Sequence, residues 1–164
     1  MARFRLFADR RGQALVEFAL ILPLFLMLLF GVIEFGRILW HHSHLDQAAR
    51  ETLRLVSIGA DRAMVKGRLI QLTVPLAGNC SASEGSGADD LGNSCTRIVL
   101  TPAAGHPLTA TITPPYSSNL KNGDSLRVAL RYRMDLITPL SSLFGPTREL
   151  QAIYVTLVET PPQP

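Results

Sequence analysis

The chain has 164 residues and a formal net charge of +3, enough for one modest domain and an accessory segment. The whole positive excess lies in residues 1–12, where four arginines accompany one aspartate; the remainder holds 12 basic and 12 acidic residues. A nucleic-acid-binding domain needs its basic excess on a folded surface, so this distribution argues against nucleic acid as a partner. A basic tail directly before an apolar segment is instead typical of a membrane-topology signal.

The longest apolar run begins directly after Glu17. Residues 18–33, FALILPLFLMLLFGVI, contain no charged side chain. With the apolar residues 14–16 on the other side of Glu17, the segment reaches about 20 residues, which spans a bilayer core of roughly 30 Å. We therefore expect a membrane span over about 14–36. A cleaved secretory signal fits less well, because the run exceeds the usual ~7–15 residues and no small-residue cleavage site follows it.

Residues 13–58 are expected to form one long helix. Pro23 removes one helical hydrogen bond and permits a kink, or is simply tolerated in a membrane helix. The second half is amphipathic, with a stripe of residues at three- and four-residue steps, namely Leu45, Ala48, Ala49, Thr52, Leu53 and Val56. A helix of ~45 residues is roughly 65–70 Å long, about twice the thickness of a bilayer core, so it must project beyond the membrane.

The rest of the chain predicts a second short helix and several strands. The helix is expected over 61–72 and should end at Val74-Pro75. Six apolar/polar alternations over 126–136 predict a strand with one buried face, preceded by a tight turn in the sequence LKNGD. The partner of this strand is expected at 108–113. Residues 97–101 (RIVLT) are another candidate.

Residues 150–159 are apolar on both faces and predict a central or doubly covered strand. The elements together predict an α+β fold, in which the long helix packs on a small antiparallel β-sheet. The predicted organisation is a leader (1–12), a helix that spans the membrane in its first half (13–58), an α+β domain (59–160) and a frayed tail (161–164).

Cys80 and Cys95 bracket a Gly-, Ser- and Asp-rich stretch. A structural zinc site needs four ligands, so two cysteines do not indicate a metal site. A disulfide closing a loop over 80–95 is the favoured interpretation; it would contribute about 3 kcal/mol by the loop-entropy estimate and would require an oxidising compartment. The alternative is two unrelated free thiols.

No motif in the sequence indicates an enzyme. His41, His42 and His44 are close, but no neighbouring acidic residue or cysteine completes a convincing metal-binding set. Half-exposed histidines where the helix leaves the membrane are the simpler interpretation. Since patterns for a Ser-His-Asp triad, a phosphate loop and HExxH are absent from the sequence, we expect no catalytic residue, no metal and no cofactor.

The stretch from about residue 11 to residue 56 resembles a known family. Its motif elements are the Arg-Gly-Gln start, VEFAL, the Leu-Pro pair, the GVIEFGR block and the closing QAARE. The combination resembles the TadE-like family, the minor pilins or pseudopilins of the tight-adherence (Tad or Flp, type IVc) pilus. RVALRYRMDLITPL and LQAIYVTLVE resemble the family's downstream strands more loosely. The resemblance implies a type IV pilin-like fold.

The resemblance also implies roles for three residues near the N-terminus. A prepilin peptidase would cut after Gly12 on the cytoplasmic side, leaving Gln13 as the new N-terminus and Glu17 as the fifth residue of the mature chain. Glycine suits such a site because it lets extended backbone approach the enzyme closely. In related pilins the fifth-residue carboxylate pairs with the α-amine of a neighbouring subunit, which would offset the penalty of a buried charge.

The expected location is the bacterial inner membrane, with a single span, the N-terminus in the cytoplasm and the α+β domain in the periplasm, before incorporation into an extracellular pilus. The expected partners are the prepilin peptidase, other Tad pilins and pseudopilins, the inner-membrane assembly platform and membrane lipid. The alternative is an uncleaved bitopic envelope protein that acts as a fixed assembly component. A plain anchor gives no reason for Glu17, since an acidic residue deep in a helix costs about 2.5–3.5 kcal/mol.

Overall fold

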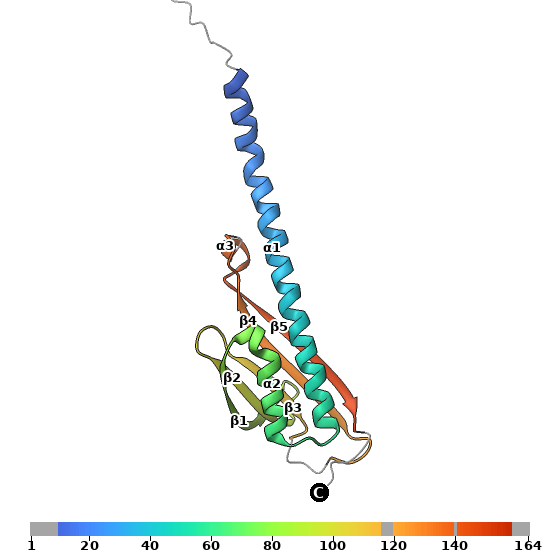
Figure 1. Cartoon of the computed structure of the whole chain (residues 1–164). Coiled ribbons are helices and arrows are strands. Elements are labelled where there is room, and N and C mark those ends of the chain that lie inside the picture. The colour runs from blue at the N-terminus through green and yellow to red at the C-terminus, as the bar shows by residue number, and fades with distance from the viewer. Residues whose placement is uncertain (1–9, 116–119, 140, 159–164) are drawn as a thin grey trace, which may run out of the picture.

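The computed structural model describes residues 10–115, 120–139 and 141–158. One long helix stands on a five-stranded antiparallel sheet, which confirms the predicted α+β class (Figure 1). The helices are α1 (Arg10–Ser57), α2 (Arg62–Ala77) and α3 (Ser141–Phe144), and the strands are β1 (Cys80–Ala88), β2 (Ser94–Pro102), β3 (Leu108–Thr113), β4 (Ser125–Asp135) and β5 (Thr147–Leu157). Most of the predicted leader (1–9) and the predicted tail (161–164) lie outside the described residues.

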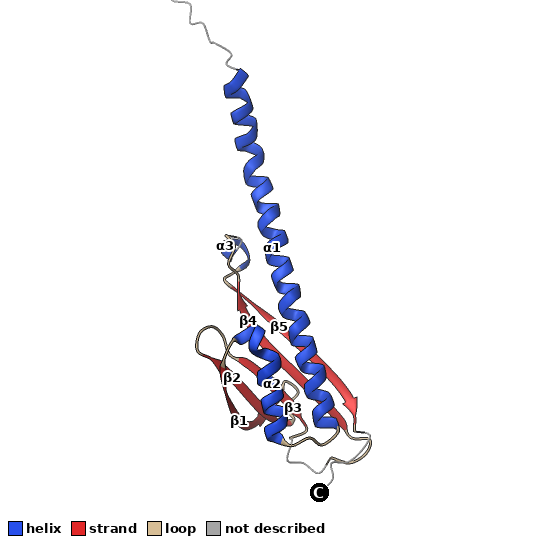
Figure 2. Cartoon of the chain, viewed as in Figure 1, coloured by secondary structure: helices blue, strands red, loops and turns tan. Residues whose placement is uncertain are grey.

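Helix α1 packs its amphipathic half on the sheet and leaves its first half projecting away from it (Figure 2). All six residues of the predicted stripe are buried: Leu45, Ala48, Ala49, Thr52, Leu53 and Val56. The helix runs unbroken through Pro23. The buried hydroxyl of Thr52 donates to the carbonyl of Ala48 at 2.7 Å, so burying it leaves no unpaired donor.

The sheet has the order β1-β2-β3-β4-β5, and each strand pairs with the next one along the chain. The register aligns even-numbered residues across all five strands, as in the row Glu84, Ile98, Ala110, Leu130 and Ala152. Because side chains alternate between the faces of a strand, the even-numbered residues face α1 and α2 and the odd-numbered ones face away. The predicted alternation over 126–136 is confirmed, since Leu126 and the even residues up to 134 are buried.

Helix α2 is longer than predicted. Asp61 caps its start by accepting a hydrogen bond from the backbone N–H of Ala63 at 3.1 Å. The predicted end at Val74-Pro75 is wrong, because a proline in the last turn removes only one backbone donor and the helix continues to Ala77. Gly78, at a φ of 66°, then closes the helix by donating to the carbonyl of Val74 at 2.8 Å.

Strand β5 lies at the edge of the sheet, so the prediction of a central or doubly covered strand is wrong. One face of the strand, with Leu150 and Ala152, is buried on the side that packs against α1. The opposite face carries apolar side chains that are 42–61% exposed, namely Ile153, Val155 and Leu157. Apolar residues on both faces predicted that other elements would pack on both sides of β5, but among the described elements the helices pack on one side only.

The predicted turn at LKNGD is present. The N–H of Asp124 donates to the carbonyl of Lys121 at 3.0 Å, and Gly123 has a φ of 93°, which favours glycine. Strands β3 and β4 are neighbours, as predicted. The turn also holds the end of β5, because the N–H of Gly123 donates to the carbonyl of Val158 at 2.8 Å and that residue's N–H donates to the carbonyl of Asp124 at 2.9 Å.

Both cysteines are free, so the predicted Cys80–Cys95 disulfide is corrected. The predicted loop over 80–95 is mostly strand: Cys80 opens β1, and Cys95 in β2 pairs with Gly87 near the other end of the hairpin. The seven residue steps from Cys80 to Gly87 correspond to about 23 Å. The register also places the two side chains on opposite faces of the sheet, and a disulfide needs Cα atoms within about 7 Å.

Both thiols should therefore react with an alkylating agent once the protein is unfolded without a reductant. Cys95 should react slowly in the native protein, since it is fully buried and burial raises the pKa of its thiol, which keeps it in the unreactive protonated form. The measurement is intact mass after iodoacetamide treatment with and without denaturant. A denatured chain carrying no adduct, which gains two only after reduction, would contradict the free-thiol assignment.

Candidate processing and assembly site

The predicted N-terminal site lies on the first turns of α1, at the end far from the sheet (Figure 1). Gly12, Gln13 and Glu17 are all exposed. The side-chain amide of Gln13 donates to Glu17 Oε1 at 3.1 Å across one helical turn. A Cβ at Gly12 would meet nothing within 4 Å, so the fold itself does not require glycine there. The three predicted residues therefore lie together on the first turns of α1, and none of them contributes to the packing of the sheet domain.

The half of α1 that carries Glu17 exposes its apolar side chains on all sides. Several are 57–75% exposed, namely Leu15, Val16, Phe18, Leu20, Ile21, Leu24, Phe25, Leu28 and Val32. The helix is long and apolar enough to cross a membrane. A continuous apolar surface of this kind needs lipid or other helices to cover it, and Glu17 stands within it.

Glu34 marks the point where α1 first meets the rest of the protein. It is only 6% exposed. Its Oε1 accepts a hydrogen bond from Arg37 Nη1 at 2.8 Å, and its Oε2 accepts one from the backbone N–H of Thr138 at 3.3 Å. Arg37 Nη2 lies 3.5 Å from the carbonyl oxygen of Asp135, at the end of β4. One carboxylate and one guanidinium therefore join α1 to the connection between β4 and β5.

The Glu34–Arg37 pair follows a pattern visible in the sequence, but the burial of Glu34 does not. A spacing of three residues places both side chains on one helix face, which is typical of an ion pair, and the pair is present. Thr138 lies 104 residues further along the chain, so no local pattern could reveal its contact with Glu34. One indication in the sequence that Glu34 has a special role is its position in the GVIEFGR block of the TadE-like resemblance.

A second carboxylate, Asp89, organises the turn between β1 and β2. Burial acts to raise its pKa, but hydrogen bonds from the backbone N–H groups of Asn93 and Leu91 and from the Thr113 hydroxyl outweigh that effect and lower the pKa. Arg127 approaches the same carboxylate at 3.5 Å. These contacts fold the turn over the outer face of the sheet at its end far from α3, a structural role that the sequence did not reveal.

The three neighbouring histidines have separate partners. His41 Nδ1 donates to a backbone carbonyl one turn earlier, and its ring stacks on Tyr132 with centroids 6.0 Å apart. His42 Nδ1 lies 3.1 Å from Asp46, and His44 packs against a tryptophan ring. Within the described parts of the chain, no three His, Cys, Asp or Glu side chains form a group that could hold a metal ion.

Residues 12–54 match the family model described as TadE-like protein. The N-terminal helix is therefore similar to that of a TadE-like protein. The TadE-like match covers nearly all of α1, including Gly12, Glu17 and the Glu34–Arg37 pair, and it is consistent with a TadE-like protein of the Tad pilus system. It does not reach β4 and β5, so the looser resemblance of those strands stays a prediction. Neither the curated proteins nor the solved structures contain a match to this chain.

Proposed function

We propose that this TadE-like chain is a minor pilin or pseudopilin, which primes or joins a Tad (Flp) pilus after trimming by a prepilin peptidase. The observation that carries the proposal is the position of Glu17: it stands five residues after Gly12 in the first half of α1, whose apolar surface no other described element covers. Its function is structural rather than catalytic. Its partners are the peptidase, other Tad pilins and pseudopilins, the assembly platform and lipid.

The geometry suggests how one carboxylate serves two states of the subunit. In the membrane-bound precursor, the Gln13 amide hydrogen-bonds Glu17 within the same helix and offsets part of the penalty of a charge near lipid. Cleavage after Gly12 would create an α-amine on Gln13. In a helix bundle that amine could pair with Glu17 of a neighbouring subunit, and a slip of one turn would leave both charges unpaired.

The proposed orientation places residues 1–12 in the cytoplasm and the sheet in the periplasm. It rests on the arginines before the span, because short cytoplasmic flanks carry the excess of basic residues. The exposed apolar face of the edge strand β5 offers the periplasmic domain a further surface for contact with other subunits.

The second candidate function is an untrimmed bitopic protein that acts as a fixed component of the assembly machine. The hydrogen bond between Gln13 and Glu17 favours it, because a carboxylate satisfied within its own helix needs no partner subunit. The two candidates differ in the N-terminus of the mature protein.

Intact-mass measurement on the membrane fraction should show a chain of 152 residues, since removal of residues 1–12 leaves 152 of the 164. Gly12→Val should block trimming, because the side chain hinders the approach of the backbone to the peptidase. Gly67→Val is the matched control: it is also an exposed helical glycine whose added Cβ meets nothing within 4 Å, and it should be trimmed normally. Recovery of the untrimmed wild-type chain with an active peptidase would favour the fixed component.

A further inference from the structure

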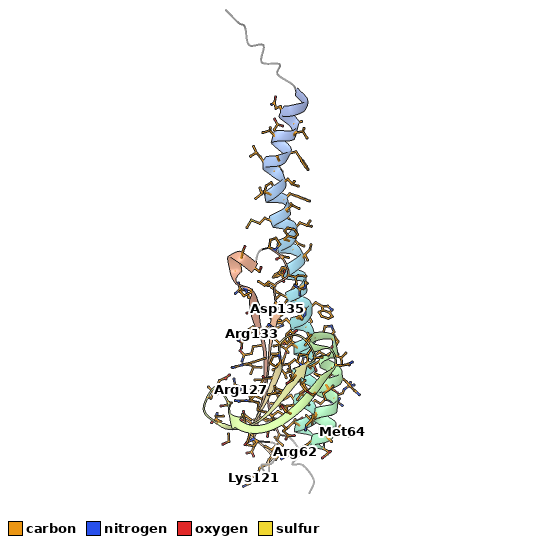
Figure 3. All side chains as sticks on the ribbon, turned by 90° about the vertical axis from the view of Figure 1, so that its left-hand side faces the viewer. Arg62, Met64, Lys121, Arg127, Arg133 and Asp135 are labelled. Atoms are coloured by element: carbon orange, nitrogen blue, oxygen red, sulfur yellow. The ribbon has the colours of Figure 1, made fainter. Side chains whose placement is uncertain are left out.

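The connection between β4 and β5 rises from the sheet along α1 (Figure 1). We call residues 136–146, of which residue 140 is not described, the β4–β5 tip. The tip is closed at its base by a hydrogen bond from the N–H of Leu136 to the carbonyl of Pro146 at 2.9 Å. It is fastened to α1 by the bond from the Thr138 N–H to Glu34. Figure 3 shows the short helix α3 standing above the sheet and beside α1.

The position along α1 of the hydrogen bond between Glu34 and Thr138 places the tip at one boundary of the membrane span. Glu34 directly follows the apolar run 18–33. The 21 residue steps from Gln13 to Glu34 correspond to about 32 Å of helix, against roughly 30 Å for the hydrocarbon core of a bilayer. If Gln13 lies at the cytoplasmic boundary, as the proposed function requires, Glu34 and the tip lie at the periplasmic boundary.

The tip presents apolar side chains at this level. Ile137 is 70% exposed and Phe144 is 56% exposed. The guanidinium carbon of Arg148 lies 5.9 Å from the centroid of the Phe144 ring. An apolar pair bordered by a cationic side chain suits the boundary between acyl chains and phosphate headgroups, where the ring can enter the apolar layer and the cation can reach a phosphate.

Two further polar groups of the tip have internal hydrogen bonds, whereas the buried Thr138 hydroxyl has no partner among the described residues. The N–H of Ser141 donates to the carbonyl of Thr138 at 3.0 Å, and the hydroxyl of Ser142 donates to the carbonyl of Pro139 at 2.8 Å. Internal bonds of this kind reduce the penalty of moving backbone and hydroxyl groups toward hydrocarbon.

From these observations we propose that the β4–β5 tip is an interfacial membrane anchor, which inserts Ile137 and Phe144 into the periplasmic leaflet at headgroup depth. Glu34 holds the tip at that depth by tying it to the membrane-spanning helix. The tip would thereby fix the height of the sheet above the membrane before the subunit leaves for a filament. This inference rests on the membrane span of the proposed function.

Tryptophan reporters in full-length protein, reconstituted into phosphatidylethanolamine/phosphatidylglycerol vesicles, test the proposal. The native Trp40 is first replaced in a Trp40→Phe background. Phe144→Trp reports the tip, and Ile137→Trp is a second reporter at an exposed site where no core packing is lost. Leu91→Trp, at a 72% exposed residue in the turn at the opposite end of the sheet, is the water-exposed control. Leu28→Trp reports the span itself.

The tip reporters should emit at shorter wavelength than the Leu91 reporter, and lipids brominated near the headgroup should quench them at least two-fold more strongly. Tip reporters that behave like the Leu91 reporter, while deeply brominated lipids quench the Leu28 reporter, would overturn the anchor and leave the span intact. A blue shift without lipid quenching would show that a second copy covers the tip, which also overturns it. If the Leu28 reporter escapes quenching too, the span and the anchor fail together.

Discussion

Glu17→Val should leave the chain inserted and trimmed in the membrane but remove it from pili. Insertion should persist or improve, because the change removes a charge from an apolar helix. Trimming should persist, since the cut depends on the glycine and on access. Assembly should fail because the α-amine of a neighbour loses its partner; removal of one member of a buried ion pair costs about 3–5 kcal/mol, or at least roughly 100-fold in incorporation. Immunoblots of sheared pili and of membranes, with intact mass, measure both outcomes.

Two further variants separate the possible roles of the carboxylate. Glu17→Gln should fail like valine if the charge matters, and should assemble nearly normally if a hydrogen bond suffices. Gln13→Ala is the matched control, because it removes the intrachain bond of 3.1 Å and keeps the α-amine after trimming. It should be incorporated normally. Normal incorporation of Glu17→Val would show that the carboxylate has no part in assembly, and the proposed role of Glu17 would be wrong.

Glu34→Ala should release the β4–β5 tip from α1. The change leaves the Thr138 N–H without its acceptor and removes the ion-pair partner of Arg37. Hydrogen bonds to charged groups contribute about 1.5–3 kcal/mol, so amide exchange in the tip should accelerate by roughly 10- to 150-fold. Hydrogen exchange with mass spectrometry on full-length protein in detergent or vesicles measures this directly. The central strands should exchange as in the wild type, because their core contacts are unchanged.

Glu51→Ala is the matched control on the same helix. Glu51 also lies near arginines, at 3.7 Å from Arg54 and 3.8 Å from Arg68, but its side chain is 27% exposed against 7% for Glu34. Partly exposed ion pairs contribute little, so exchange in the tip should not change. Amide exchange in the tip of Glu34→Gln should be faster than in the wild type and slower than in Glu34→Ala, since the change keeps an acceptor for the Thr138 N–H and loses the charge. Equal exchange in Glu34→Ala and wild type would remove the role of Glu34 in docking the tip.

The elements with strong local periodicity could be predicted because their patterns depend on residues a few positions apart. The stripe from Leu45 to Val56 repeats at helical spacing, and the alternation beginning at Leu126 repeats at strand spacing. Both patterns are visible in a short window, and both segments have the predicted structure. Gly12, Gln13 and Glu17 were singled out by the family resemblance instead; the structure places all three on α1, which begins at Arg10 rather than at the predicted residue 13.

The amino-acid sequence by itself determined the apolar span, the amphipathic helix and the alternating strand, and its resemblance to the TadE-like family pointed to Gly12 and Glu17. Only the tertiary structure decided that β5 lies at an edge, that Cys80 and Cys95 occupy opposite faces of the sheet, and that Glu34 is buried. The physical reason is that periodicity reports which side of an element is apolar, whereas burial and pairing depend on what covers that side. For Glu34 the covering residue is Thr138, and its contact exists only because β4 and β5 pair and carry their connection up to α1.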